Sequence, residues 1–260
     1  MPLPLLVLGS KNYSSWSLRP WMLLKHLGVK FEEVVLKLDT EQFHQEISKY
    51  SPTRRVPVLI DGDVRVWDSL AIAEFAAEQV THWRSDVPGA EPRVWPADPV
   101  ARAHARAIAA EMHAGFQTLR ELYPVNIRAR NVKVRMTPAL ARDIERVDRI
   151  WSGARHRFGS GGPWLFGEYS AADAMFAPVA LRFRTYGASL SPRSREYLDT
   201  VLNDPVLNEW IAAAQSEDHV LAKYDLRKRG ARGKNRARSA GRTRPAKTAS
   251  RPKRRAARKR

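Results

Sequence analysis

A valine–proline pair between a turn and an apolar run is the feature that most restricts the fold of this chain. Pro57 follows Val56 and leads into the run Val58-Leu59-Ile60. Because proline lacks a backbone N–H, it suits the first position of a strand and leaves the backbone before it free of the sheet. Cis X-Pro bonds are rare, so the pair alone allows an ordinary trans turn as well as a cis bond. The sequence therefore predicts a turn that opens a buried strand.

A hairpin and a helix are predicted directly after this strand. Asp61-Gly62-Asp63 is typical of a hairpin turn, and Val64-Arg65-Val66-Trp67 alternates as a strand does. Asp68 and Ser69 then precede residues 70–76, whose apolar side chains recur at helical spacing. In one interpretation these two residues only cap the helix. In the other they also bind a charged ligand, because a helix N-terminus has spare N–H groups that attract a carboxylate.

A third motif lies near the start of the chain. Leu5-Leu6-Val7-Leu8 predicts a short buried strand, and residues 18–25 predict a helix with Pro20 in its first turn. Ser14 and Ser15 fall at the junction between them. A hydroxyl group there can donate a hydrogen bond to a thiolate, with support from the helix dipole. The alternative is that these serines only cap the helix.

The three motifs, in this order within the first 83 residues, resemble the glutathione S-transferase family. The resemblance implies an α+β thioredoxin-like N-terminal domain followed by an all-α helical C-terminal domain. It also implies a cis bond between Val56 and Pro57, with the backbone of Val56 paired to the cysteinyl part of glutathione, as in strand addition. Asp68 and Ser69 would hold the charged amino end of glutathione. Arg55 is our candidate for the carboxylate at its glycine end.

The serine-rich motif is similar to that of the serine-type transferases of the zeta class. The chain has Ser14-Ser15-Trp16-Ser17-Leu18-Arg19 where that class has Ser-Ser-Cys-Ser-x-Arg. The resemblance implies that Ser14, or Ser15 as second candidate, stabilises the glutathione thiolate and so lowers the thiol pKa from about 8.5. Trp16 stands where the class has cysteine, which puts isomerase activity of the maleylacetoacetate type in question. We expect Arg19 to form a structural salt bridge.

The pattern along the chain predicts two domains and a tail. Residues 1–83 form the thioredoxin-like glutathione-binding domain, and residues 84–98, rich in Pro, Gly and charge, form a linker. Residues 99–226 form the helical domain, in which 102–122 and 138–158 are each expected to be one helix. Residues 227–260 contain no large apolar side chain and are expected to be disordered.

The second substrate would bind where the helical domain faces Ser14, since an apolar electrophile needs an apolar cleft. Arg182 and Arg184 flank one of the candidate walls and hint at an acidic group on the substrate. A separate pair, Ser170 and Asp173, has the spacing of a capping box, and we expect it to be structural. The candidate walls of the electrophile pocket are Tyr13, Trp16, Met112, Phe116, Phe183 and Tyr186.

Composition removes some classes of function. The chain has no cysteine, which excludes disulfides, cysteine-based metal sites and a catalytic thiol of its own, and we expect no metal. Of its 45 Lys and Arg residues, 17 lie in residues 227–260 with no acidic residue, which leaves 45 − 17 = 28 basic against 27 acidic groups elsewhere. The tail is therefore either a non-specific nucleic-acid binder or an idle solvated extension.

Three functions stay open from the sequence. The first is conjugation of glutathione, as co-substrate, to a small hydrophobic electrophile. The second is a glutathione-dependent isomerase or dehalogenase, in which glutathione adds and leaves again. The third is a non-catalytic transferase-like module with a polyanion-binding tail. The family resemblance implies a homodimer. We see no signal peptide and no apolar run of membrane-spanning length, so we expect a cytoplasmic protein that does not bind a membrane.

Overall fold

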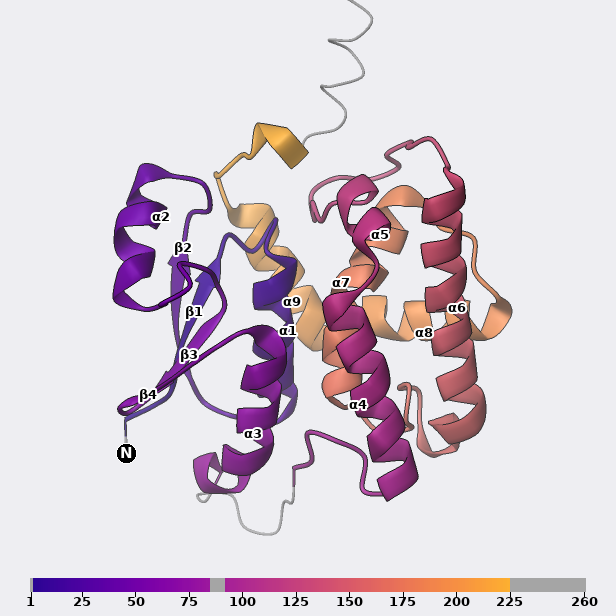
Figure 1. Ribbon diagram of the computed structural model, residues 1–260, viewed down its shortest axis with the longest axis horizontal. Helices are drawn as coiled ribbons and strands as arrows, with labels where there is room; N and C mark the ends of the chain where they lie inside the picture. The colour runs from indigo at the N-terminus through magenta and orange to yellow at the C-terminus, as the bar shows by residue number, and fades with distance from the viewer. Residues whose placement is uncertain (1, 85–91, 225–260) are drawn as a thin grey trace, which may run out of the picture. The chain divides into compact units, whose positions relative to one another are not determined.

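A four-stranded mixed sheet forms the core of the first half of the computed structural model, which describes residues 2–84 and 92–224 (Figure 1). The strand order is β2-β1-β3-β4. Strands β1 and β2 are parallel, whereas β1 pairs antiparallel with β3, and β3 antiparallel with β4. The strands are β1 Leu5–Gly9, β2 Glu32–Leu36, β3 Val58–Asp61 and β4 Val64–Trp67.

Helices cover both faces of this sheet. Helices α1 (Ser15–His26) and α3 (Ser69–Trp83) contact each other and the strands, and they lie between the sheet and the helices that follow (Figure 1). Helix α2 (Glu41–Glu46) and the short 3-10 helix η1 (Ile47–Lys49) lie on the other face. The order β-α-β-α-β-β-α is that of a thioredoxin-like domain, as predicted.

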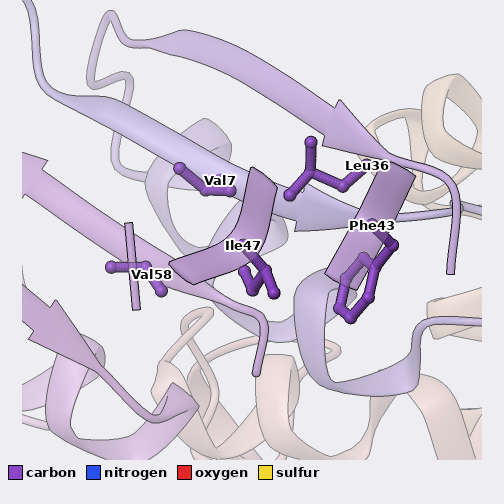
Figure 2. Close-up of a cluster of buried hydrophobic side chains, with 5 residues drawn as sticks. All are labelled: Val7, Leu36, Phe43, Ile47 and Val58. Atoms are coloured by element: carbon purple, nitrogen blue, oxygen red, sulfur yellow. The ribbon is translucent and has the colours of Figure 1, made fainter. Parts of the chain in front are cut away.

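The alternation of apolar residues along the strands explains this arrangement. Val7 and Val58 point to the face where Phe43 and Ile47 pack, and the cluster is completed by Leu36 (Figure 2). The neighbouring strand positions, among them Leu6 and Leu59, are fully buried on the opposite face. Because successive side chains of a strand point to opposite faces, a continuous apolar run buries both of them.

The second half of the described chain is helical, which confirms the predicted fold class. Helix α7 is the centre of this half: it is buried along nearly its whole length and contacts α1, α4 and α8. The helices are α4 Pro99–Ala114, α5 Gln117–Leu122, α6 Pro138–Phe158, α7 Ala171–Tyr186, α8 Pro192–Asn203 and α9 Pro205–Ser216, with 3-10 turns η2 Gly159–Gly161 and η3 Ala222–Tyr224.

The prediction of a single helix over residues 102–122 is wrong, because the helical conformation is interrupted between α4 and α5. Gly115 is extended and Phe116 adopts the left-handed conformation, with φ of 61°. The last carbonyl groups of a helix need donors from elsewhere. Arg120 supplies them, since its guanidinium group donates to the carbonyl oxygens of Met112, His113 and Gly115.

The capping box at the start of α7 is present. The Ser170 side chain accepts from the backbone of Asp173, and the Asp173 carboxylate accepts from the Ser170 backbone N–H at 2.9 Å. Asp173 is fully buried and also accepts from Leu165 N–H and from the hydroxyl of Tyr197, both at 3.0 Å. The pair thus ties the start of α7 to the loop before it and to α8.

The described residues, 2–84 and 92–224, belong to one compact unit. The boundaries predicted at 83, 98 and 226 stay predictions. The predicted disordered tail, residues 227–260, lies outside the described residues, as do residues 85–91 of the predicted linker. No helix within 2–84 and 92–224 has the length and apolar character needed to cross a membrane.

Candidate functional site

A cavity of about 420 Å³ lies where the N-terminal turn of α1, the turn before β3, the junction of β4 and α3, and the end of α4 meet. Its volume is in the range of small-molecule sites. The structure thereby brings together six residues that the sequence placed in a binding site, from three separate motifs. The lining residues are Trp16, Thr53, Arg55, Val56, Pro57, Trp67, Asp68, Ser69 and His113.

The backbone of Val56 is available at this cavity. The Val56–Pro57 bond is cis. No residue in the described ranges hydrogen-bonds to the N–H or C=O of Val56. Since most buried backbone polar groups in proteins are paired, a free donor and acceptor side by side suit an extended peptide ligand.

Asp68 caps α3 from an unusual backbone conformation. Its Oδ1 accepts from the N–H groups of Leu70 at 2.8 Å and Ala71 at 3.3 Å, so Asp68 caps the helix, and its role in ligand binding stays a prediction. Its φ of 82° lies in a region that residues other than glycine rarely adopt. Such outliers persist where surrounding structure holds them, often at ligand sites. The second carboxylate oxygen, Oδ2, is directed to another partner.

That partner is His113, at the end of α4, which the sequence reasoning missed. Its Nε2 lies 3.2 Å from Asp68 Oδ2. Burial lowers the pKa of His113, opposed by the charge of Asp68 and assisted by Arg19 and Arg120, so the imidazole is neutral at pH 7. With the proton on Nε2, facing the carboxylate, Nδ1 is an acceptor. No signal in the sequence pairs a residue of the helical half with Asp68.

Two buried polar atoms from lining residues have no hydrogen-bond partner within the described ranges. They are Nδ1 of His113 and Oγ of Ser69. Nearly all buried polar atoms in folded proteins are satisfied, so each exception needs an explanation. A ligand that supplies one donor to His113 and one partner to Ser69 would satisfy both.

The two candidate serines directly precede Trp16 in the sequence, but unlike Trp16 they do not line the cavity. Ser14 is the N-cap of α1: its Oγ accepts from Ser17 N–H at 3.2 Å and donates to Ser17 Oγ at 2.7 Å. Ser15 Oγ accepts from Arg182 Nη2 at 3.4 Å. In the described part of the chain nothing accepts the Ser15 hydroxyl hydrogen. Ser14 therefore caps the helix, whereas the hydroxyl hydrogen of Ser15 has no acceptor among the described residues.

Of the six predicted walls of the electrophile pocket, Trp16 lines the cavity. The five others are buried to 8% exposure or less, and their role as walls stays a prediction. The ring of Tyr186 stacks on Tyr123, and its hydroxyl donates to the carbonyl of Pro124. Contacts of this kind are those of a packed core. The buried five are Tyr13, Met112, Phe116, Phe183 and Tyr186.

The prediction of a salt bridge for Arg19 is wrong for the described residues. Arg19 is 2% exposed, and its Nε and Nη1 have no hydrogen-bond partner among those residues. Helix α7 packs on α1 and carries an acid in its first turn, Asp173, but that carboxylate is already occupied by four donors. The Arg19 guanidinium instead lies over the ring of Trp16, 4.1 Å from its centre. Within the described ranges, no cluster of three or more His, Asp or Glu side chains is placed to hold a metal ion.

Comparison with protein families gives two matches. The model of the glutathione S-transferase N-terminal domain matches residues 13–79, and that of the C-terminal domain matches residues 137–213.

Three curated proteins illustrate the relatives of the chain. A probable maleylacetoacetate isomerase of Caenorhabditis elegans is 35% identical over 46% of this chain, and the match spans 50% of that protein's length. Maleylacetoacetate isomerase of Rattus norvegicus is 27% identical over 73% of this chain and 82% of that protein. Dichloromethane dehalogenase of Methylorubrum extorquens is 44% identical over 20% of this chain and 19% of that protein.

Solved structures agree with the fold. A glutathione transferase homologue from Burkholderia, determined with bound glutathione, superposes with a TM-score of 0.60 and 25% identity, over 83% of this chain and all of that one. A Tau class glutathione S-transferase from mango, Mangifera indica, has a TM-score of 0.60 at 19% identity, over 82% of this chain and 96% of that one.

Proposed function

We propose, from the premise that this chain belongs to the glutathione S-transferase family, that it binds glutathione in the cavity and directs its thiolate at a small electrophile. The observation that carries the proposal is that residues lining one cavity bring together polar groups that have no partner among the described residues. They are the backbone of Val56, the hydroxyl of Ser69 and Nδ1 of His113. A γ-glutamyl peptide has groups to pair with each of them.

Each part of glutathione has a partner in this arrangement. The cysteinyl backbone pairs with Val56. The γ-glutamyl carboxylate accepts from Ser69 at the N-terminus of α3, where the helix dipole favours an anion. The γ-glutamyl ammonium group donates to Asp68 Oδ2 and to His113 Nδ1. Arg55, exposed at the cavity rim, is the partner of the glycine carboxylate.

A serine hydroxyl at the start of α1 stabilises the thiolate. Hydrogen bonding and the helix dipole both favour the charged form of the thiol, which lowers its pKa toward neutrality. Of the two candidates, Ser15 is favoured, because Ser14 donates its hydroxyl hydrogen to Ser17 and accepts from the Ser17 N–H. For Ser14 to stabilise the thiolate, its hydroxyl hydrogen must rotate away from Ser17 Oγ.

A glutathione-dependent isomerase or dehalogenase is the second candidate. It is favoured by the alignment with rat maleylacetoacetate isomerase, which extends over 73% of this chain, and by the shorter match to a dichloromethane dehalogenase. All these reactions begin with attack of the glutathione thiolate on carbon. They differ in whether the sulfur stays on the product or is expelled again.

Calorimetric titration of glutathione into the full chain tests the site. We expect binding at micromolar to millimolar strength, weakened at least tenfold in Asp68→Ala and in Ser69→Ala. Because Ser69 Oγ has no partner in the described part of the chain, Ser69→Ala should bind less glutathione without losing stability. Asp63→Ala, an exposed acid in the β3–β4 turn, is the matched control and should bind normally. No binding at millimolar glutathione would reject the proposal in favour of a non-catalytic module.

The thiolate absorbance of bound glutathione distinguishes the two serines. We expect Ser15→Ala to raise the pKa of the bound thiol more than Ser14→Ala does. The opposite order would assign the role to Ser14, at the cost of its hydrogen bond to Ser17.

The homodimer and the nucleic-acid partner also stay proposals. A homodimer is tested by sedimentation. Non-specific nucleic-acid binding by residues 227–260 should weaken steeply with salt, because each phosphate contact releases a counterion. Deletion of the tail should abolish that binding, and its persistence would reject the tail as the binding element.

A further inference from the structure

A second cavity, of about 770 Å³, lies at the opposite ends of α1 and α4 from the cavity described above. It is formed by the end of α1, residues 92–98, the start of α4, the end of α6 with η2, and the segment before α7. Its volume is in the range of ligand sites. Among the described residues, the two cavities have no lining residue in common, so the second cavity is a separate site.

Aromatic side chains line the second cavity and are held in place by contacts among themselves. The ring of Tyr169 stacks on that of His26, with 3.5 Å between the ring centres. Phe158 stacks on Phe166 in the same way, at 5.4 Å. Trp95, the fifth lining ring, is 5% exposed. The cavity therefore offers a ligand flat apolar walls whose positions the fold already fixes.

Two of these rings carry a buried polar atom that has no hydrogen-bond partner within residues 2–84 and 92–224. They are Nε1 of Trp95 and the hydroxyl of Tyr169. An indole N–H can only donate. Burial, together with the charges of Asp173 and Asp204, raises the pKa of Tyr169 well above its ordinary value, so its hydroxyl keeps the hydrogen at neutral pH. Each group is therefore a donor that lacks an acceptor, an exception that needs an explanation.

The acceptors next to Trp95 in the chain are already in use. The carbonyl oxygens of Pro96 and Ala97 accept from the guanidinium group of Arg102, at 3.1 and 2.7 Å. Both of these residues line the second cavity. The chain thus satisfies the carbonyl groups of this segment and leaves the indole N–H to a partner from outside.

The exposed charged side chains that line the second cavity balance one another. Asp98 and Glu168 are acidic, and Arg93 and Arg157 are basic. One carboxylate oxygen of Asp98 also accepts from the backbone at the start of α4. Two charges of each sign select neither an anion nor a cation. The lining therefore favours a neutral ligand.

The ligand that fits these groups brings acceptors without donors. An ordinary peptide brings one N–H for each carbonyl group, whereas proline brings the carbonyl group alone. A proline-rich segment in the polyproline II conformation has no internal hydrogen bonds, so its carbonyl groups are available to outside donors. Aromatic-lined grooves are the general means by which proteins bind such segments. Because the segment is extended before it binds, it loses little conformational freedom on binding.

We propose that the second cavity binds a proline-rich segment of a partner protein, with its rings against the aromatic walls and its carbonyl groups accepting from Trp95 Nε1 and the Tyr169 hydroxyl. Both donors then have acceptors, and the apolar walls are covered. The proposal does not depend on the glutathione site, because the two cavities are lined by different residues.

Calorimetric titration of the full chain with hexaproline, blocked at both ends, tests the proposal. The matched control is a blocked hexapeptide of alternating alanine and glutamine, which is equally long and uncharged but has an N–H at every residue. We expect hexaproline to bind with a dissociation constant of about 1 mM or lower, and about tenfold tighter than the control peptide, as two hydrogen bonds to buried donors allow.

Three variants assign the binding to this cavity. Tyr169→Phe removes only the hydroxyl and should weaken hexaproline binding about three- to tenfold without lowering the thermal midpoint. Trp95→Phe removes the indole N–H and part of the ring, and should weaken binding at least as much. Trp151→Phe is the control, because it removes another buried indole N–H that is unpartnered in the described chain but lines neither cavity. It should leave hexaproline binding unchanged.

The outcomes that would overturn the proposal are distinct from those that concern glutathione. Equal binding of the two peptides, or no binding of either at millimolar concentration, would reject a proline-rich ligand. Unchanged hexaproline binding in both Tyr169→Phe and Trp95→Phe would reject this cavity as the site. Tighter binding of flavone, a flat neutral molecule with a carbonyl acceptor, with the same dependence on Tyr169, would assign the cavity to small aromatic ligands instead. Asp68→Ala should leave hexaproline binding unchanged.

Discussion

Replacing Asp173 by alanine removes the carboxylate that accepts hydrogen bonds from four donors. The buried carboxylate accepts from Leu165 N–H at 3.0 Å, from Ser170 N–H and Oγ at 2.9 and 3.0 Å, and from the hydroxyl of Tyr197 at 3.0 Å. None of these donors has water in reach if the packing holds, since Ser170, Leu165 and Tyr197 are each at most 2% exposed. The substitution therefore tests how much the start of α7 contributes to stability.

The magnitude has two opposing parts. Each buried donor left without an acceptor costs about 1–3 kcal/mol, so four of them cost about 6 kcal/mol in the lower half of that range, at about 1.5 kcal/mol each. Removing the carboxylate also removes its own burial cost. Burial raises the pKa of Asp173 from 3.8 to about 6, and this shift corresponds to about 3 kcal/mol at pH 7. The expected net loss in the free energy of unfolding is about 3 kcal/mol.

Urea unfolding at pH 7, followed by tryptophan fluorescence, measures this loss from the shift in midpoint at constant m-value. Asp199→Ala, an exposed acid on α8, is the matched control and should change stability by less than about 0.5 kcal/mol. A loss below about 1 kcal/mol in Asp173→Ala would refute the reasoning. It would mean that the donors find other partners or that the carboxylate contributes little.

The remaining predictions concern pH, caps and charge. Because the folded-state pKa of Asp173 is raised above its unfolded value, folded protein binds this proton more tightly, so the contribution of Asp173 to stability falls by about 3 kcal/mol as pH rises from about 4 to 6. Asp173→Asn should remove that part of the pH dependence in urea melts, and an unchanged slope would assign it to other groups. Ser170→Ala should cost about 0.5–2 kcal/mol of unfolding free energy and leave glutathione affinity unchanged; normal stability with lost binding would contradict its structural role. Arg19→Met should preserve stability or raise it by about 1 kcal/mol, since it removes an unpaired buried charge, whereas a loss above 1 kcal/mol would point to a stabilising contact for Arg19.

The elements of this chain that have strong local signals follow from the sequence. The helix predicted over 138–158 matches α6 because Thr137 and Pro138 open it, and a glycine-rich segment ends it. The β3–β4 hairpin and the start of α3 follow from alternation, from Gly62 and from the cap at Asp68. Each of these signals lies within a few residues of the feature it determines.

The features that the sequence did not predict depend on distant partners. Helical spacing continues through Gly115 and Phe116, so the break between α4 and α5 is not visible locally, and Arg120 is needed to satisfy the carbonyl groups it exposes. The contact of His113 with Asp68 joins two halves of the chain. The isolation of Arg19 depends on the side chains that it meets in the fold, which are Trp16 and the like-charged Arg120 and Arg182. None of these three features produces a recognisable pattern in the amino-acid sequence.

The contact between His113 and Asp68 has a consequence for how the protein unfolds. One partner belongs to the sheet-containing half and the other to the helical half, and both line a single cavity. A ligand that binds both residues acts as a reversible cross-link between the two halves. It stabilises the state in which the halves are packed together, and this stabilisation grows with the ratio of ligand concentration to dissociation constant. Glutathione should therefore suppress proteolysis at the segment joining α3 to α4, and residues up to Trp83 expressed alone should bind it more weakly.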